Sequence, residues 1–209
     1  MRAGIMDKVV AGRNRLPRFW MQMAADTRGI AAVEFALILP LMILMFFGLI
    51  DISMGVAADR KVTIIAQSMA DLASRYTKVT NTDFTNFFTI GDAILTPYAT
   101  GNLTARISQI YIDPNDGGKG KVQWSNGDAP LTSGATVIVP AGLIGKDSSS
   151  KVLADQYLIL AEVNFVYKPI IGYVVPKAGI TLTESTYTRP RQSTCVYYLT
   201  ETCGTKTSL

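Results

Sequence analysis

The hydropathy pattern is dominated by one long apolar run near the N-terminus. Residues 30–50 contain a single charged side chain, that of Glu34. A helix rises about 1.5 Å per residue, so this run would span roughly the 30 Å of a bilayer core. In lipid the backbone must satisfy its own hydrogen bonds, and membrane helices tolerate an internal proline such as Pro40. The run therefore predicts one transmembrane helix over residues 30–50.

The helical pattern continues beyond the apolar run. Between residues 51 and 76 there is no proline and one glycine, and apolar residues recur at the spacings of one helix face. These residues are Val62, Ile65, Met69, Leu72 and Tyr76. We expect this stripe to pack on the protein's own sheet, with a helix–helix seam in a filament as the alternative. For residues 30–55, which have no local sheet to meet, we expect the seam.

A second, shorter helix is predicted after residue 80. Thr82 or Asp83 could cap its N-terminus, and Pro97 would stop it. The side chains expected to bury one face of this helix are Phe84, Phe87, Phe88 and Ile94.

From residue 103 onward the apolar period becomes that of β-strands. Residues 103–112 alternate up to Ile107 and then shift parity, which predicts a β-bulge at Ser108–Gln109. A turn and a returning strand at 121–125 would complete a hairpin. Further strands are expected at 136–143, 155–171 and 178–190, the second of them being the strongest and an interior strand. Helices followed by an antiparallel sheet indicate an α+β fold.

Charge is distributed unevenly along the chain. The net charge is +4 and the mean hydropathy is +0.23. Six basic and two acidic residues precede Ile30, whereas the remainder carries fourteen of each sign. The basic excess is therefore a flank of the apolar run rather than a nucleic-acid-binding face. Because positive flanks stay in the cytoplasm, we expect a cytoplasmic N-terminus and an external domain after Asp51.

Three interpretations of the apolar run compete. It could be a plain signal anchor, a signal peptide cut after Ala58, or the leader and helix of a prepilin. The run exceeds the roughly 7–15 apolar residues of a signal peptide. Glu34 favours the third interpretation, because a carboxylate in a membrane segment is costly and needs a partner. A cut after Gly29 would give Ile30 a free α-ammonium one helical turn from Glu34, close enough to neutralise it within or between chains.

The stretch RGIAAVEF, residues 28–35, resembles the prepilin peptidase signature, in which a basic leader ends in glycine and a glutamate and an aromatic residue follow. Its Glu-Phe form resembles the TadE-like and TadG-like proteins of the Tad (tight adherence, type IVc) pilus system. The resemblance implies cleavage between Gly29 and Ile30, and an assembly role for Glu34 and Phe35. It continues loosely to the C-terminal strands, through Phe165, Tyr167, Pro169 and the segment Arg189–Pro190–Arg191.

The expected organisation is that of a pilin-like α+β protein. We expect a cytoplasmic leader (1–29), a transmembrane helix (30–50), its periplasmic continuation (51–76) and a periplasmic α+β domain (77–209). The resemblance implies a minor pilin in the inner membrane that enters or supports a pilus. Its partners would be a prepilin peptidase, other pilins and the inner-membrane assembly platform. An uncleaved, TadG-like anchored domain that binds cell wall or substrate is the alternative, and a membrane-tethered hydrolase is a third.

No candidate catalytic or metal site stands out. The chain has no histidine, which removes the commonest general base and metal ligand. Asp113, Asn115 and Asp116 fit a hairpin turn better than a calcium loop, which would need a glutamate where Trp124 stands. Two cysteines are too few for zinc, so outside the cytoplasm we expect Cys195 and Cys203 to form a disulfide. We expect no cofactor and no enzymatic activity.

Overall fold

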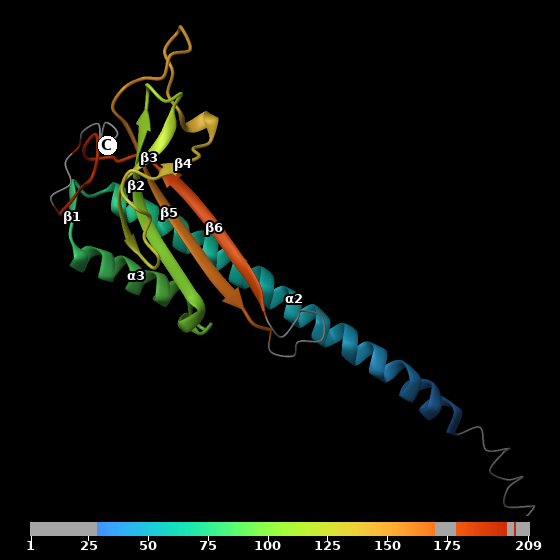
Figure 1. Ribbon diagram of the computed structural model, residues 1–209. Helices are drawn as coiled ribbons and strands as arrows, with labels where there is room; N and C mark the ends of the chain where they lie inside the picture. Colours follow the sequence, from blue (N-terminus) through green and yellow to red (C-terminus); the bar gives the residue numbers. More distant parts are fainter. Residues whose placement is uncertain (1–28, 170–178, 200–202, 204–209) are drawn as a thin grey trace, which may run out of the picture. The chain divides into compact units, whose positions relative to one another are not determined.

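The computed structural model describes residues 29–169, 179–199 and 203 of the chain (Figure 1). The predicted leader, apart from Gly29, therefore lies outside the described residues. The helices are α2 (Ile30–Ser74) and α3 (Asn81–Leu95), with 3-10 turns η2 (Thr100–Asn102) and η3 (Ala141–Leu143). The strands are β1 (Lys78–Val79), β2 (Leu103–Asp113), β3 (Lys119–Gly127), β4 (Thr136–Val137), β5 (Gln156–Tyr167), β6 (Ile180–Thr188) and β7 (Tyr197–Tyr198). The chain divides into two compact units, residues 1–49 and 50–209.

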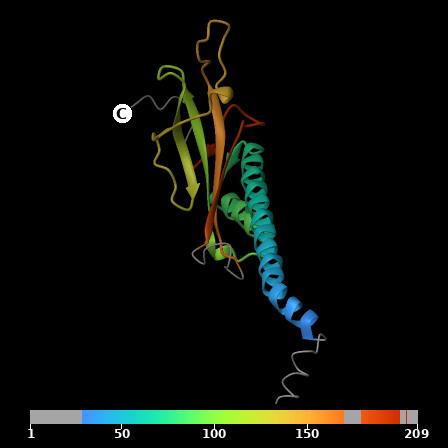
Figure 2. The same ribbon diagram turned by 90° about the vertical axis from the view of Figure 1, so that its right-hand side faces the viewer.

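The five larger strands form one antiparallel sheet in the order β4-β3-β2-β5-β6. β5 pairs with β2 on one side and β6 on the other, so it is an interior strand, as its run of apolar residues on both faces indicates. Figure 2 shows the second part of α2 running along one face of this sheet. The predicted α+β fold, with a long N-terminal helix on an antiparallel sheet, is confirmed.

The second part of α2 supplies the core on this face. Val62, Ile65 and Met69 are buried and belong to one cluster with the sheet residues Ile107 and Ile159. Four alanines of α2 are also buried in the cluster, where their small side chains let the helix approach the sheet closely. These are Ala58, Ala66, Ala70 and Ala73. The expectation that the stripe packs on the protein's own sheet is therefore confirmed for Val62, Ile65 and Met69, with Leu72 partly buried against the same cluster. Tyr76 lies beyond the end of α2 and is 37% exposed.

The shorter helix α3 closes the same core from the side. Its N-cap is Thr80, whose hydroxyl accepts a hydrogen bond from the backbone N–H of Asp83, while the Asp83 carboxylate accepts one from the backbone N–H of Thr80. The predicted caps Thr82 and Asp83 were therefore wrong as caps, because this reciprocal capping box places Asp83 at the third helical position. Phe84 is buried against Trp124, with ring centroids 5.6 Å apart.

The opposite face of the sheet carries a second, smaller core. Ile110, Ile112, Val122, Leu158 and Leu160 are buried there. The segment between β3 and β5 packs against them through Leu131, Val137, Leu143 and Ile144. From Ile110 to Ile112, β2 is therefore apolar on both faces because both faces are covered.

This second core corrects the predicted β-bulge. The pairing of β2 with β5 runs without interruption from Leu103 to Ile112, so β2 itself has no extra residue. The register shift lies between β2 and β3, where Gln109 is opposite Trp124 and Ile110 is opposite Val122. The extra residue is thus Gln123 of β3. The parity change in the sequence marked a second buried face rather than a bulge in β2.

Two further departures lie at the sheet periphery. The predicted strand at 136–143 is reduced to two residues of β4 and the turn η3. The C-terminal strand β7 was not predicted. It pairs in parallel with β1, the short strand that follows α2 in the chain. It is held from the sheet side, because Val196 donates its N–H to Gln109 Oε1 (2.6 Å) and accepts the indole N–H of Trp124 (2.9 Å).

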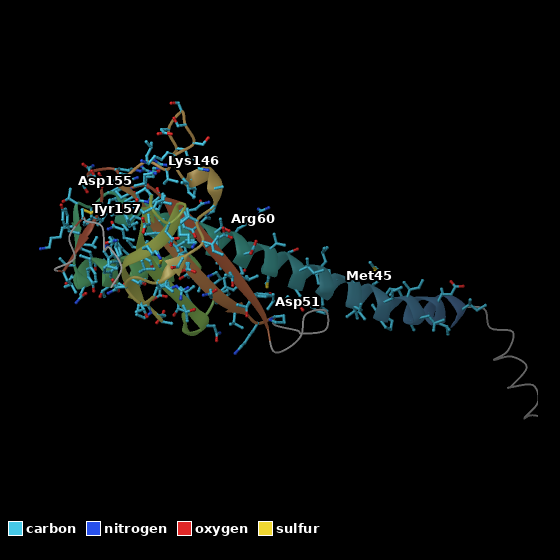
Figure 3. All side chains as sticks on the ribbon, turned by 45° about the horizontal axis from the view of Figure 1, so that its top comes forward. Met45, Asp51, Arg60, Lys146, Asp155 and Tyr157 are labelled. Carbon is cyan, nitrogen blue, oxygen red and sulfur yellow. A yellow bond between two sulfur atoms is a disulfide. The ribbon has the colours of Figure 1, made fainter. Side chains whose placement is uncertain are left out.

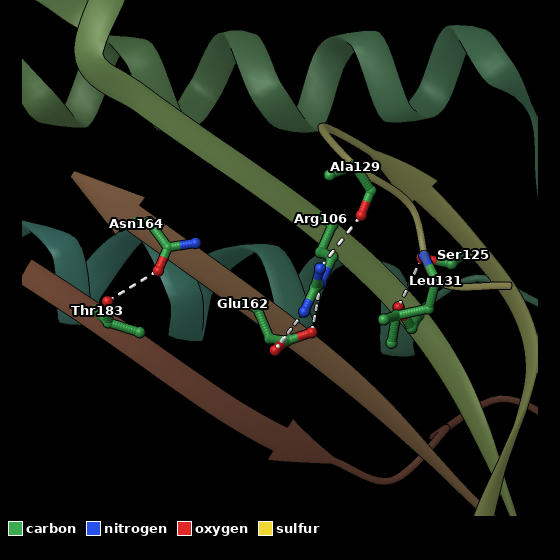
Figure 4. A network of polar contacts seen from close by, with 8 residues as sticks. Arg106, Ser125, Ala129, Leu131, Glu162, Asn164 and Thr183 are labelled. Carbon is green, nitrogen blue, oxygen red and sulfur yellow. Dashed lines mark hydrogen bonds and ion pairs between the residues drawn. The ribbon is translucent and has the colours of Figure 1, made fainter. Parts of the chain in front are cut away.

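The open part of the face opposite α2 is polar. The Arg106 guanidinium donates two hydrogen bonds to the Glu162 carboxylate, of 2.6 and 2.8 Å, across β2 and β5 (Figure 4). Beside this pair, Thr183 donates to the amide oxygen of Asn164 at 2.8 Å. Glu162, the only acidic residue within β5, is therefore paired with a basic residue of the neighbouring strand.

Candidate membrane and assembly segment

The predicted processing site lies at the beginning of α2. The helix begins at Ile30, directly after Gly29. Gly29 is exposed, and a Cβ built on it would meet no atom within 4 Å. The fold of the described residues therefore places no steric demand for glycine at this position. A requirement for glycine here would have to come from outside the folded chain, for example from an enzyme that approaches the backbone.

The predicted assembly residues lie in the first turns of α2 and face outward. Ile30 is 54% exposed and Phe35 is 60% exposed. Glu34 is exposed too, and it forms no ion pair within the described residues. Four residues separate Ile30 from Glu34, so both project from one side of the helix. The Glu34 carboxylate is therefore accessible on the surface of the described helix.

The apolar part of α2 has the properties of a membrane anchor. Among the described residues, α2 is the one helix that is long and apolar enough to cross a bilayer. In its most apolar 18-residue window only 11% of the residues are buried. A water-soluble domain rarely exposes such a continuous apolar surface. Pro40 lies inside the helix without ending it. These features are compatible with a single N-terminal membrane anchor.

A buried carboxylate stands where the apolar run ends. Asp51 is 1% exposed, and in the described part of the chain neither carboxylate oxygen has a hydrogen-bond partner. The Tyr167 hydroxyl of β5 donates to the Asp51 carbonyl oxygen at 3.4 Å. Burial raises the pKa of the Tyr167 hydroxyl above its ordinary value, and the negative charge of Asp51 raises it further, so this hydroxyl stays protonated and can donate.

The sequence pattern does not single out Asp51, which stands at the boundary of the apolar run. A charged residue at the end of a predicted transmembrane run is ordinary. The signal that could have found it is its position on the same side of α2 as the buried Ala58, two helical turns further along. One turn beyond Asp51 along α2, the Tyr98 hydroxyl donates a hydrogen bond to the Met54 carbonyl oxygen at 2.9 Å.

The C-terminal residues that carried the resemblance have structural roles. Phe165 and Tyr167 are buried in the core beneath α2, with Tyr98 packed against both rings. Arg191 forms an ion pair with Asp71 of α2 at 2.6 Å, and Arg189 donates to the Leu143 carbonyl at 3.0 Å. These contacts fasten the end of β6 to α2 and to the loop across the sheet.

The two cysteines are joined in the structure. Cys195 and Cys203 form a disulfide with their Cα atoms 5.9 Å apart. Cys195 is buried against Tyr111 and Tyr157, whose ring centroids are 5.2 Å apart. The bridge thus attaches Cys203 to a cluster on β2 and β5, two interior strands of the sheet. Whether it forms in the cell depends on an oxidising compartment and stays a prediction.

The acidic turn between β2 and β3 is a hairpin turn. Asp113 accepts the backbone N–H of Asn115 at 2.9 Å. Asp116 forms ion pairs with Lys119 (2.9 Å) and Lys121 (3.3 Å), and hydrogen bonds to these lysines lower the pKa of its carboxyl group. Since two ammonium groups already occupy the Asp116 carboxylate, calcium would have to displace both. The described residues hold no group of three or more potential metal-ligating side chains.

Taken together, the fold and the N-terminal segment define a class. A long helix, apolar and exposed in its first part and packed on an antiparallel sheet in its second, is the pilin-like arrangement. Residues 29–75 match the family model described as TadE-like protein. The resemblance to the TadE-like family is thereby confirmed over α2, which is less than half of the chain.

This family is one of pilin-type structural proteins, so the match indicates a protein associated with the Tad pilus. No curated protein and no solved structure shows significant similarity to the chain. The family match begins at Gly29 and ends directly after α2. The sheet and the C-terminal residues lie outside it, so the roles of Phe165, Tyr167 and Arg191 follow from the contacts alone.

Proposed function

We propose that this chain is a TadE-like minor pilin that takes part in assembling a Tad (type IVc) pilus and is cut after Gly29 by a prepilin peptidase. The observation that carries the proposal is Glu34. It is a carboxylate on an exposed apolar helix, one turn after the expected new N-terminus, with no ion-pair partner in the described residues. The alternative is an uncleaved, TadG-like anchored domain that keeps Met1.

The energetics explain why such a glutamate would be kept. A carboxylate in the middle of a membrane helix costs about 2.5–3.5 kcal/mol on insertion scales, and less near an end. Pairing it with the α-ammonium of Ile30 on a neighbouring subunit would neutralise both charges. Once such a pair is buried, removing one partner typically costs about 3–5 kcal/mol, because the other charge is left unpaired. Glu34 would therefore be tolerated during insertion and required during assembly.

The proposed setting follows from the charge pattern. The basic flank would keep the N-terminus in the cytoplasm, and residues 51–209 would lie in the periplasm. The inner-membrane assembly platform and other pilins would receive the processed helix. The exposed apolar side chains of α2, such as Leu37 and Leu49, would contact lipid before assembly and neighbouring helices afterwards.

The first experiment replaces Glu34. We expect Glu34→Leu to insert and to be cut, but not to enter or support pili, because the neighbouring ammonium would be stranded in an apolar seam. Glu34→Asp should be partly impaired, since its carboxylate is one methylene short. Pili are counted by electron microscopy, and the mature N-terminus is determined by mass spectrometry. Met42→Leu, an uncharged change at an exposed residue of the same helix, is the matched control.

Wild-type piliation in Glu34→Leu cells that contain normal amounts of the protein would contradict an assembly role for Glu34. The mature N-terminus separates the candidate functions independently of piliation. Ile30 indicates a processed pilin, and Met1 an uncleaved anchor.

The second experiment tests the cut itself. We expect Gly29→Val to leave the leader attached, because a branched side chain blocks close approach of an enzyme to the backbone. The fold should be unaffected, since the added side chain begins in open space. The mass of the protein in the membrane fraction reports the cut, and the Cys195–Cys203 disulfide reports folding. A mass that corresponds to a chain starting at Ile30 would overturn this prediction.

A further inference from the structure

The starting point is the unpaired carboxylate of Asp51. An ionised group buried without a partner is among the most costly features a fold can contain. Asp51 is nevertheless 1% exposed, and both of its oxygens lack a hydrogen-bond partner in the described residues. The adjacent Tyr167 hydroxyl is directed to the Asp51 backbone carbonyl. The described part of the fold therefore buries a carboxyl group and supplies no partner for either of its oxygens.

Asp51 lines a cavity of about 300 Å³ between α2 and the end of the sheet. Its walls are formed by Ile52, Gly55, Val56 and Asp59 of α2 together with Tyr167, Ile180 and Leu182. A calcium ion takes six to eight oxygen ligands, which this mainly apolar wall does not offer. A basic side chain fits better, because its aliphatic stem can lie on the apolar wall while its charged head approaches Asp51. The Asp51 carboxylate, whose oxygens are buried in the free chain, would turn toward that head on binding. Ile52 and Val56 are each 49% exposed and form an apolar rim.

The chain itself offers one suitable basic group on the same helix. α2 contains two basic residues, Arg60 and Lys61. Lys61 is engaged, because its ammonium donates to the carbonyls of Ile94 and Thr96, both at 2.7 Å. Arg60 is exposed and forms no ion pair within the part of the chain that the structure describes.

Arg60 cannot reach the cavity of its own chain. It follows Asp51 by nine residues, which is about 13.5 Å along the helix and two and a half turns around it. The two side chains therefore lie on opposite sides of α2 (Figure 3). One helix thus carries an acidic cavity on one side and an unpaired cation, further along its axis, on the other.

We propose that the Asp51 cavity binds the Arg60 guanidinium of a second copy of this chain. The two copies would lie parallel, displaced along their helix axes. Such a contact joins two different surfaces and leaves one cavity and one arginine free at the ends, so it can extend into a row instead of closing as a symmetric dimer.

This inference rests on the proposed function and deepens it by naming a subunit contact. The pairing of Ile30 on one copy with Glu34 on the next requires a displacement of about 6 Å in one direction. The pairing of Asp51 with Arg60 requires a displacement in the same direction. Side chains on a helix lean toward its N-terminus, so the Arg60 guanidinium lies closer to the level of Asp51 than the roughly 13.5 Å between the two backbone positions. The displacement that the Asp51–Arg60 pairing requires is therefore smaller than about 13.5 Å and nearer to the roughly 6 Å of the Ile30–Glu34 pairing.

The test uses two differently tagged full-length copies in the same membrane. Asp51→Asn removes the negative charge of the carboxylate with almost no change in size, and Arg60→Gln removes the positive charge of the guanidinium while keeping a polar side chain. For either variant alone, the amount of one copy recovered with the differently tagged copy should fall at least about tenfold below that of the wild type. Mixing the two should restore dimers but nothing larger, because Arg60 of the first can bind Asp51 of the second while the reverse contact is absent.

Cross-linking before solubilisation and gel electrophoresis report the size of the oligomers. Arg75→Gln is the matched control, since it removes an exposed arginine that pairs with Asp71 and should leave the oligomers unchanged. Mixed variants that associate no better than each alone, wild-type oligomers in either single variant, or association only with a different protein would overturn the proposal. Processing and piliation are measured separately. The experiment can therefore reject the Asp51–Arg60 contact without rejecting the pilin function, and it can reject the pilin function without rejecting the contact.

Discussion

At the scale of single residues, the sheet depends on one glycine that the sequence pattern does not single out. Gly120 lies on β3 opposite Val137 of β4. A Cβ at this position would lie 2.5 Å from Ile110 Cγ2, 2.7 Å from Val139 Cγ2 and 3.0 Å from the Val137 carbonyl oxygen. The absence of a side chain is therefore what allows the loop beyond β4 to cover the second core.

We expect Gly120→Ala to destabilise the domain by about 1–3 kcal/mol, the usual cost of overpacking a tight core. Gly142→Ala is the matched control, because a Cβ there meets no atom within 4 Å. Urea denaturation of the detergent-solubilised chain, followed by tryptophan fluorescence, measures the difference. Equal midpoints for the two variants would show that the second core is looser than its packing indicates.

At the scale of elements, α2 is a single helix with two kinds of surface. Its first part exposes apolar side chains in all directions, whereas its second part buries alanines and branched residues on one face and exposes charges on the other. The change of parity along β2, which predicted a bulge in that strand, also reflects two kinds of surface. A strand covered on both faces loses its simple two-residue period, and the sequence does not show which partner strand contains the extra residue.

At the scale of the whole molecule, the folded core is independent of the apolar run. Within the described residues, every buried hydrophobic side chain has a number of 58 or higher. The compact unit that contains them begins at Ile50. Changes confined to the first part of α2 should therefore leave the core of this domain intact.

We expect a chain that begins at residue 50, exported to the periplasm, to fold cooperatively and to contain the Cys195–Cys203 disulfide. A chain that begins at residue 75 should not fold, because it lacks Val62, Ile65 and Met69, whose loss exposes the α2-side core. Thermal unfolding by circular dichroism and alkylation of free thiols provide the readouts. A cooperative transition in the shorter chain, or none in the longer one, would contradict this division.

The sequence by itself determined the features that depend on neighbours along the chain. The apolar length of residues 30–50, the stripe at Val62, Ile65 and Met69, and the position of Glu34 one turn from Ile30 are all set by local periodicity. Only the tertiary structure decided which strand carries the extra residue, that β7 returns to β1, and that Asp51 is buried without a partner in the described residues. These features depend on which distant surfaces cover a residue, and no local pattern encodes that.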